Sequence, residues 1–339
     1  SEDKSNYKVV LTGDMVYNSM RMWQGANGIS PCDGIVSPAY TVLMPKVPIS
    51  NGYFAAFFKS PNLINEFRRN SQGMTSDTWN LKYPQIETIK VCIPALSEQK
   101  RVSDMLGTLE RRIAKQAQLV DNLKKYKRGV FETVFSQKVR LIPRNKRKDW
   151  QKYKLSDFAT RVTRKNGGQS DIPLTISAQY GLIDQRDFFS KTVASADMSG
   201  YYLLRSGEYA YNRSTSNDYP FGSIKRLELY PMGAVSTLYL CFRVKDDIVL
   251  SDLAKWYFES SQWHRGVNEI CAEGARNHGL LNVPTDGFFN TVHTLPSDPE
   301  EQLAIASYLS LFQARLDSAQ AVLEKLLRIR SGLMQRLFT

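Results

Sequence analysis

The chain carries the same stretch of sequence twice, and this duplication limits what it can fold into. Residues 1–18 align without a gap with residues 195–212, and both segments end in a Gly-acid-x-x-Tyr-Asn motif, GDMVYN and GEYAYN. Further along, residues 34–40 (GIVSPAY) correspond to residues 233–239 (GAVSTLY). A repeat of about 200 residues is much longer than the ~20–45 residues of a solenoid repeat. The pattern therefore predicts a tandem duplication of one larger unit.

The most periodic part of each copy predicts a long helix. Residues 93–135 align with residues 295–338, and from Gln99 and Gln302 onward each residue lies 203 positions before its counterpart. In both segments apolar residues recur at alternating spacings of three and four, which is the signature of a coiled-coil seam. The seam positions are Leu106, Leu109, Ile113, Gln116, Val120, Leu123, Lys127, Val130 and Val134 in the first copy, and Leu309, Phe312, Leu316, Ala319, Leu323, Leu326, Arg330, Leu333 and Leu337 in the second.

A long amphipathic helix exposes an apolar stripe that needs a partner in water. Because both copies carry the same stripe and a globular segment joins them, we expect the two helices to pair antiparallel about a pseudo-two-fold axis. The alternative is that two chains dimerise through one helix. The polar residues Gln116, Lys127 and Arg330 are expected to fix the register of the seam or its choice of partner.

The remaining segments predict an α+β fold, because short β-branched and aromatic runs in 150–295 accompany one clear helix at 250–270. Since residue 1 aligns with residue 195, residues 150–194 have no counterpart in the first copy, and we expect about 45 residues of the first domain to precede Ser1. The predicted architecture is two globular domains separated by two long antiparallel coiled-coil helices. Its parts are a first domain at 1–92, a first spacer helix at 93–140, a basic linker at 141–154, a second domain at 150–295 and a second spacer helix at 296–339.

The charge of the chain indicates a polyanionic partner. The net charge is +12, and the surplus lies in residues 97–140, with 11 Lys and Arg against 5 Asp and Glu, and in residues 141–154, with 6 against 1. Nucleic acid is the commonest partner of such a surplus. A charge run is often only a solvated face, but this one also joins two domains, where an elongated anion could pass.

Sequence motifs for catalysis and for cofactors are missing. The chain has no phosphate-binding G-x-x-x-x-G-K-[ST] loop and no G-x-G-x-x-G loop, and its three histidines have no ligand spacing. Four cysteines lie far apart, which argues against zinc or a disulfide framework and favours reduced, cytoplasmic thiols. No apolar run approaches the ~18 residues of a membrane span, and no secretory signal pattern is present. We therefore expect a cytoplasmic, non-catalytic protein.

Two pairs of loops occupy matching places in the copies but differ in sequence. Residues 18–28 match 212–222, and residues 72–80 match 273–282. Their Arg, Asn, Gln and Ser side chains are those that pair with base edges, although polar turns of this kind are also common in structural roles. The expected DNA contacts are Arg21, Gln24 and Asn27 in the first copy, Arg213, Ser214, Asn217 and Lys225 in the second, and further Arg164, Lys165, Arg276, Asn277 and His278.

On these features the chain resembles the specificity (S) subunits of type I restriction-modification systems. The resemblance covers nearly the whole chain and rests on the alternation of domain and long helix. It also rests on four kinds of motif: the helix entries IPALSEQ and LPSDPEEQ, the helix ends RGVFETVF and SGLMQRLF, the GDMVYN, WQGANG and GIVSPAY segments, and WQKYKLSDFA at the start of the second domain.

This resemblance implies a subunit without catalytic activity whose two target-recognition domains each read one half of a bipartite DNA site. It implies helices that set the spacing and dock two methyltransferase subunits, and motor-nuclease subunits that complete the complex. It implies no cofactor in this chain, with S-adenosylmethionine bound by the methyltransferase. We expect exposed residues outside the seam to bind that partner, namely Lys124, Lys125, Tyr126, Arg128, Phe131 and Phe135. The alternatives are an interaction scaffold that uses the coiled-coil rod without DNA, and a methyltransferase-nuclease fragment, which the missing motifs disfavour.

Overall fold

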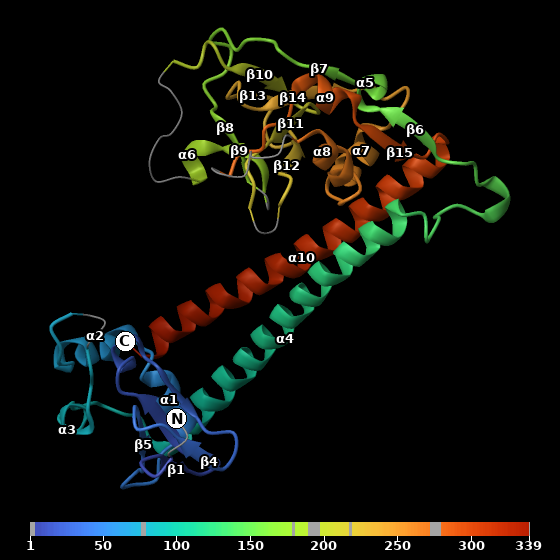
Figure 1. Cartoon of the computed structure of the whole chain (residues 1–339). Coiled ribbons are helices and arrows are strands. Elements are labelled where there is room, and N and C mark those ends of the chain that lie inside the picture. Colours follow the sequence, from blue (N-terminus) through green and yellow to red (C-terminus); the bar gives the residue numbers. More distant parts are fainter. Residues whose placement is uncertain are drawn as a thin grey trace. The chain divides into compact units, whose positions relative to one another are not determined.

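The computed structural model describes residues 4–75, 79–177, 180–188, 197–216, 219–271 and 279–338. The chain divides into two compact units, of which the first comprises residues 1–121 and 317–339 and the second comprises residues 122–316. Two long helices, α4 (Leu96–Phe135) and α10 (Pro299–Leu337), contribute one end to each unit. Figure 1 shows both units and labels their elements where there is room.

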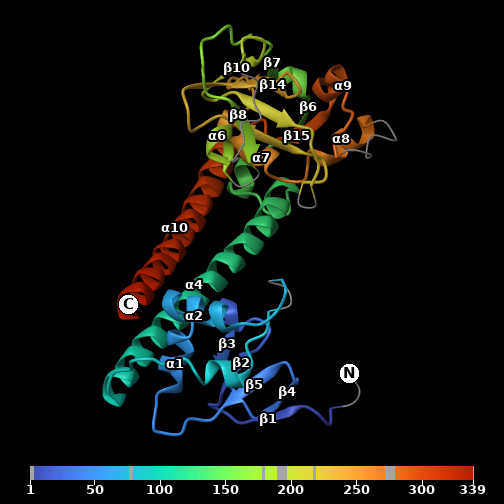
Figure 2. The same cartoon turned by 90° about the vertical axis from the view of Figure 1, so that its left-hand side faces the viewer.

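The first unit combines a small antiparallel sheet with short helices. Strands β3, β2 and β5 form a three-stranded sheet in that order, and β1 pairs with β4. Figure 2 shows these strands together, with α1 beside the first turns of α4. The elements are β1 (Lys8–Val10), β2 (Met15–Asn18), η1 (Met22–Gln24), β3 (Asn27–Ile29), β4 (Gly34–Val36), β5 (Tyr40–Leu43), α1 (Asn51–Phe57), α2 (Pro61–Asn70) and α3 (Tyr83–Ile86).

The second unit contains a larger version of the same arrangement. Its four-stranded sheet has the order β12-β11-β14-β7, and β10 pairs with β13, β8 with β9 and β15 with β6. The strands are β6 (Gln151–Lys154), β7 (Ala159–Arg161), β8 (Leu174–Ser177), β9 (Gly181–Asp184), β10 (Tyr202–Arg205), β11 (Tyr209–Asn212), β12 (Ser223–Arg226), β13 (Met232–Val235), β14 (Leu240–Val244) and β15 (Val292–Leu295). The helices are η2 (Arg144–Lys146), α5 (Leu155–Phe158), α6 (Gln185–Phe188), α7 (Ser251–Phe258), α8 (His264–Ile270) and α9 (Thr285–Asn290).

The duplication predicted from the sequence is confirmed strand by strand. The order β3-β2-β5 in the first unit matches β12-β11-β14 in the second, and the pair β1–β4 matches β10–β13. The second unit adds β6, β7, β8 and β9, which come from the segment that has no counterpart in the first copy. Strand β15 pairs with β6, whereas the matching residues 90–93 of the first unit form no strand.

The shared Gly-acid-x-x-Tyr-Asn motif has the same physical role in both units. Gly13 and Gly207 adopt φ values of +91° and +86°, a backbone region in which glycine avoids the strain of a side chain. Four residues later, Tyr17 and Tyr211 are fully buried in the central strand of each sheet. The motif therefore turns the chain into the central strand and anchors that strand in the core.

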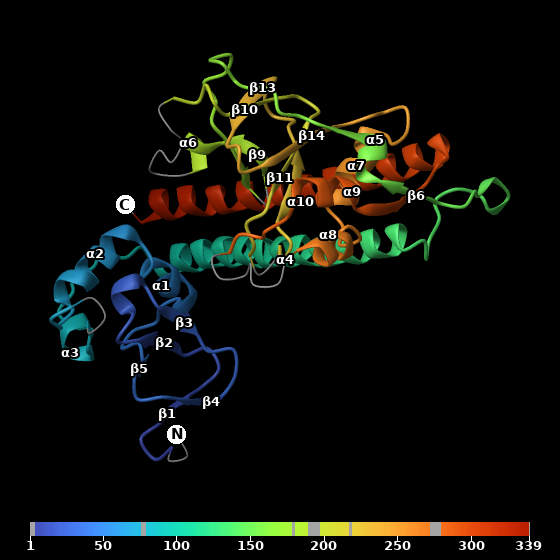
Figure 3. The same cartoon turned by 45° about the horizontal axis from the view of Figure 1, so that its top comes forward.

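The coiled-coil seam is also confirmed, and within each unit the segments of α4 and α10 lie side by side and antiparallel (Figure 3). All eighteen predicted seam residues are buried or half-buried. In the first unit Gln116 Nε2 donates to the Ala319 carbonyl at 2.8 Å, and Glu110 lies 3.6 Å from Arg330. From Gln116 to Glu110 the residue number on α4 falls, and the residue number of the contact on α10 rises from Ala319 to Arg330. The two helices therefore run in opposite directions.

A buried glutamine joins each long helix to its own globular domain. Gln99 is the fourth residue of α4 and Gln302 the fourth of α10, and each is 2 % exposed. The Oε1 of Gln99 accepts from the Ser50 N–H at 3.0 Å, and that of Gln302 accepts from the Leu250 N–H at 2.7 Å. The Nε2 atoms donate to the carbonyls of Pro94 and Pro296 at 2.9 and 2.8 Å. The side-chain amide of Gln99 thus ties the start of α4 to the N-cap of α1, and that of Gln302 ties the start of α10 to the N-cap of α7.

We predict that Gln302→Leu lowers the free energy of unfolding by about 2–4 kcal/mol, because it leaves a buried N–H and two carbonyls without partners. Urea unfolding measures the loss. Gln118→Leu, on the exposed face of α4, is the control and should change stability by less than ~0.5 kcal/mol. Equal effects of the two substitutions would show that the buried amide does not hold the helix.

A buried histidine lies in the core of the second unit. His293 is 2 % exposed, and its ring nitrogens lie 3.1 Å from the Tyr257 hydroxyl and 2.8 Å from the Thr291 hydroxyl. Burial lowers the pKa of His293 to about 4, because the charged imidazolium would lose its hydration. Both hydroxyls satisfy the neutral ring, so the folded state keeps His293 uncharged.

The stability of the second unit should therefore fall with pH below the ordinary histidine pKa of ~6.5. Between that value and a pKa of about 4 the unfolded chain binds a proton that the folded chain does not. Stability is fully present above pH ~6.5 and is lost progressively toward pH ~4, by on the order of 3 kcal/mol. Urea unfolding at pH 7.5 and 5 tests this, and His293→Gln should remove much of the dependence. An unchanged pH dependence in that variant would contradict the assignment.

Candidate nucleic-acid interface

Each unit brings its two predicted reading loops together through the same backbone hydrogen bond. In the first unit the Leu81 N–H donates to the Ser19 carbonyl at 2.8 Å, and in the second the Leu281 N–H donates to the Arg213 carbonyl at 3.0 Å. The second unit adds a bond from the Thr215 N–H to the Gly279 carbonyl at 2.7 Å. Loops far apart in sequence, 18–28 with 72–80 and 212–222 with 273–282, are therefore neighbours wherever they are described.

The motif asparagine opens the first loop of each pair with the same turn. The Oδ1 atoms of Asn18 and Asn212 accept from the N–H groups of Met20 and Ser214, each at 3.0 Å. An asparagine side chain that bonds the backbone two residues onward mimics a turn and stops the strand. The conserved frame of the two loops thus has a local cause, and the residues beyond it can vary without disturbing the strand.

Two tryptophans connect the loops of the first unit. The rings of Trp23 and Trp79 meet edge to face with centroids 5.2 Å apart, and the Arg68 guanidinium lies 5.8 Å from the Trp23 ring. Edge-to-face pairs and cation–π contacts each stabilise such a cluster modestly. Sequence reasoning missed this contact, although one tryptophan in each of two matched loops was a usable signal.

The predicted residues of the first unit lie on this loop surface. Arg21 and Gln24 are exposed and have no side-chain partner within the described part of the chain. Asn27 is half-buried, and its Nδ2 donates to the Gly25 carbonyl at 3.1 Å while its Oδ1 is buried without a partner. Arg21 and Gln24 are therefore placed to contact a ligand, and Asn27 shapes the loop.

In the second unit three of the predicted cations have partners inside the fold. Arg164 pairs with Glu208 at 2.7 Å and donates to the Leu203 carbonyl at 3.2 Å. The Lys165 ammonium donates to the Gly200 carbonyl at 2.9 Å and lies 4.7 Å from the Tyr202 ring. Lys225 is only 8 % exposed and forms an ion pair with Glu259. Arg164 and Lys225 therefore support the domain from within, whereas Lys165 is exposed and braces the surface near Tyr202.

The guanidinium of Arg213 ties its loop to two others. Its Nη2 donates to the Leu238 carbonyl at 3.0 Å, its Nη1 donates to the Val283 carbonyl at 3.4 Å, and its Nε is buried without a partner. Ser214 is exposed beside it. The other predicted contacts, Asn217, Arg276, Asn277 and His278, lie outside the described residues.

The basic linker, together with Arg140 just before it, forms ion pairs with acidic residues at the start of α10. Lys146 pairs with Glu300 and Lys148 with Asp298, each at 2.8 Å, and Arg140 forms a bidentate pair with the buried Glu301. The bond to Lys148 lowers the pKa of Asp298, and the bond to Glu300 raises that of Lys146. Carboxylates in the first turn also complement the helix dipole. The linker is therefore fixed to α10 by its own cations.

The expected partner-binding residues on α4 divide into two groups. Lys124, Lys125 and Arg128 are exposed, and Tyr126 is 59 % exposed with its ring 5.6 Å from that of Phe312. The expectation that Phe131 and Phe135 are exposed is wrong, because they are 5 % and 4 % exposed. Helix α7 covers them, with Trp256 against Phe131 at 6.1 Å and Tyr257 against Phe135 at 5.5 Å. A single-helix pattern cannot show that a second element covers a face outside the seam.

Within the described ranges no group of three or more His, Cys, Asp or Glu side chains could hold a metal ion. The described helices include none that is long and apolar enough to cross a membrane. Cys241 is buried, and burial raises the pKa of its thiol to about 12. This thiol is therefore protonated at neutral pH and is a poor nucleophile.

Comparison with known proteins identifies the fold. No protein-family model matches the chain. The specificity subunit of the type I restriction enzyme EcoKI from Escherichia coli K12 is 26 % identical over 186 residues, which cover 51 % of this chain and 39 % of that protein. The chain therefore matches well under half the length of this curated relative.

Solved structures of S subunits match almost the whole chain. The S subunit of a type I restriction-modification system from M. genitalium has a TM-score of 0.63 at 11 % identity, covering 98 % of this chain and 84 % of its own. The HsdS subunit of Thermoanaerobacter tengcongensis has a TM-score of 0.50 at 15 % identity, with 99 % and 83 % covered. A structure on complex assembly and conformational transition of the type I system scores 0.53 at 16 % identity, with 99 % and 84 % covered. The resemblance to specificity subunits and the predicted fold class are confirmed.

We predict that Arg164→Ala lowers the free energy of unfolding by about 2–3 kcal/mol, because Glu208 would be left largely buried without its cation. Arg21→Ala should change it by less than ~0.5 kcal/mol, because Arg21 is exposed and has no internal partner. Arg164→Lys, which retains the charge, should recover part of the loss. Thermal and urea unfolding distinguish the two arginines, and equal stability of the two alanine variants would contradict their separate roles.

Proposed function

We propose that this chain, which has the fold of type I specificity subunits, directs a type I restriction-modification complex to a bipartite DNA sequence. Each unit would read one half of the site. The observation that carries the proposal is the repeated frame of the reading loops, held by the same asparagine turn and the same backbone hydrogen bond in both units. Loops with the same backbone frame but different exposed side chains would let the two units bind two different half-site sequences.

Direct reading of bases requires exposed donors and acceptors at the loop surface. In the first unit Arg21 and Gln24 meet this condition, and the Trp23–Trp79 contact holds the two loops that present them. In the second unit Ser214 is exposed, and Arg213 positions its loop through two backbone carbonyls. We propose that Asn217, Arg276, Asn277 and His278 complete the second reading surface.

The affinity for DNA would come largely from partners, because phosphate contacts dominate protein–DNA binding. Several cations of this chain already pair internally, among them Lys146, Lys148, Lys225 and Arg164. We propose that two methyltransferase subunits, which carry S-adenosylmethionine, dock on the helices, and that motor-nuclease subunits join them in the cytoplasm. The chain itself would bind no cofactor and perform no catalysis.

The exposed cations of α4, Lys124, Lys125 and Arg128, together with Tyr126, remain the residues proposed to contact the methyltransferase. They lie outside the seam and outside the core of the second unit. We propose that the two long helices set the spacing between the half-sites.

The test is expression of the chain with its cognate methyltransferase, followed by sequencing of methylated genomic sites. We expect a bipartite motif with a fixed spacer. Arg21→Ala should relax one position in one half-site, since a lost base contact costs about 1–3 kcal/mol of discrimination. The other half-site should be unchanged.

Lys46→Ala is the matched control, because Lys46 is an exposed cation of the same unit that pairs with Glu87 instead of lying in a reading loop. It should leave both half-sites unaltered. Methylation without a bipartite motif would refute the proposed function. A motif that Arg21→Ala leaves intact would remove only that residue from the reading surface.

A further inference from the structure

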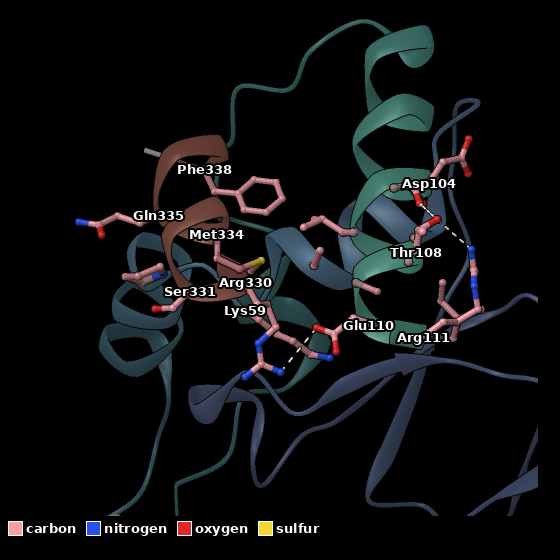
Figure 4. Close-up of a pocket in the computed structure, with 18 of the residues that line it drawn as sticks. Lys59, Asp104, Thr108, Glu110, Arg111, Arg330, Ser331, Met334, Gln335 and Phe338 are labelled. Carbon is pink, nitrogen blue, oxygen red and sulfur yellow. Dashed lines mark hydrogen bonds and ion pairs between the residues drawn. The ribbon is translucent and has the colours of Figure 1, made fainter. Parts of the chain in front are cut away.

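The first unit contains a groove of about 1080 Å³ between α1, the first half of α4 and the end of α10. Its apolar lining includes Ala56, Leu106, Met334 and Phe338. In Figure 4, Met334 and Arg330 project from α10 and Phe338 follows its last residue on one side, and Glu110 on α4 approaches the Arg330 guanidinium from the other. This volume is slightly above the usual range of ligand pockets, about 300–1,000 Å³.

The duplicated fold shows which residues of the second unit correspond to this groove. The glutamine bonds pair Ser50 with Leu250, which aligns α1 with α7 at an offset of 200 (250 − 50). The long helices align at an offset of 203 residues. One ring contact supports both offsets, because Phe57 lies 5.4 Å from Phe338 in the first unit and the equivalent Tyr257 lies 5.5 Å from the equivalent Phe135 in the second. In this register Ala56 corresponds to Trp256, Met334 to Phe131 and Gly107 to Ser310.

In the second unit the corresponding space is filled by an indole ring. Trp256 is 4 % exposed, stacks on Phe131 with centroids 6.1 Å apart, and donates its Nε1–H to the Ser310 hydroxyl at 3.0 Å. The Lys127 ammonium lies 5.8 Å from the same ring. Apolar, hydrogen-bonding and cationic groups thus surround one tryptophan.

In the first unit all three of these positions carry smaller or more flexible residues, which opens the groove. A Cβ added at Gly107 would have only the Arg111 guanidinium nearby, at 3.7 Å. The cation is retained, because Arg330 occupies the position of Lys127 and is 43 % exposed beside Glu110. The groove of the first unit therefore keeps residues that could surround an indole ring, but Ala56 stands where the second unit has Trp256.

We propose that this groove receives an aromatic side chain, tryptophan foremost, from a partner protein. Met334 adapts to a ring, Arg330 can stack on it, and the Glu110 carboxylate can accept the indole N–H. The lining carries the cations Lys59, Arg111 and Arg330 as well as the carboxylates Asp104 and Glu110, so its apolar residues, and not its charge, favour a ring. Resting on the function proposed above, the partner is the methyltransferase subunit.

The groove itself is tested with N-acetyltryptophanamide and the full chain labelled with ¹³C at the methionine methyls. We expect a saturable shift of the Met334 methyl signal, assigned with Met334→Leu. N-acetylleucinamide should give none, and Ala56→Trp, which supplies the ring internally, should abolish the response. No saturable shift, or an equal shift with the leucine compound, would overturn the proposal.

The partner is tested by the affinity of the chain for the methyltransferase subunit. Ala56→Trp should raise the dissociation constant tenfold or more, because its ring occupies the groove and the partner's aromatic side chain can no longer bind there. Losing one buried aromatic contact at an interface typically weakens binding by about tenfold or more. The control Met44→Trp adds the same ring at a residue that is 85 % exposed and outside the groove, and it should have no effect. Melting temperatures confirm that both variants fold. Should Ala56→Trp fail to fold, the double variant Gly107→Ser/Met334→Phe uses only residues present at the equivalent places and serves instead.

The outcomes separate this inference from the proposed function. If the wild-type chain binds the methyltransferase and the filled variant binds equally well, the aromatic groove is overturned and the function stands. If the wild-type chain forms no complex, the proposed function fails together with this choice of partner. The methyl shift then still decides whether the groove accepts an indole.

Discussion

The antiparallel packing of α4 against α10 is the interaction on which both units depend. In the first unit Leu106 of α4 belongs to the core that buries Tyr17, and Leu337 of α10 packs against this core. In the second, Val130 and Leu309 belong to the core that buries Tyr211. In each unit α4 and α10 therefore pack against the globular core as well as against each other. Separating the helices would expose both cores, because neither apolar stripe can be buried alone.

Duplication explains which features the units share and which they do not. The groups that connect elements are kept, such as Gln99 with Gln302 and Asn18 with Asn212, because losing a buried hydrogen bond is costly in either copy. The groups at loop surfaces differ, because exposed side chains change at little cost to stability. The groove beside Ala56 is an exception, since a core position that is filled by Trp256 in one copy is open in the other.

The positive charge of the chain has two uses that composition cannot separate. Part of it forms ion pairs within the second unit, as with Arg140 and Glu301 or Lys225 and Glu259. Another part remains exposed on α4, at Lys124, Lys125 and Arg128. Exposed charges can attract a polyanion or an acidic partner, whereas charges buried in ion pairs contribute little to the field outside the protein. The net charge of +12 therefore overstates what this chain alone offers to DNA.

The sequence by itself determined the duplication, the long helices with their seam, and the matched frames of the reading loops. These follow from local periodicity and from motifs such as Gly13 and Asn18, whose roles depend on the nearby backbone. Only the tertiary structure decided that Phe131 and Phe135 are covered by α7, that Arg164 pairs with Glu208, and that Trp23 meets Trp79. Each of these contacts joins residues far apart in sequence. The pattern of one segment shows that a side chain needs a partner, but packing between elements selects which partner it has.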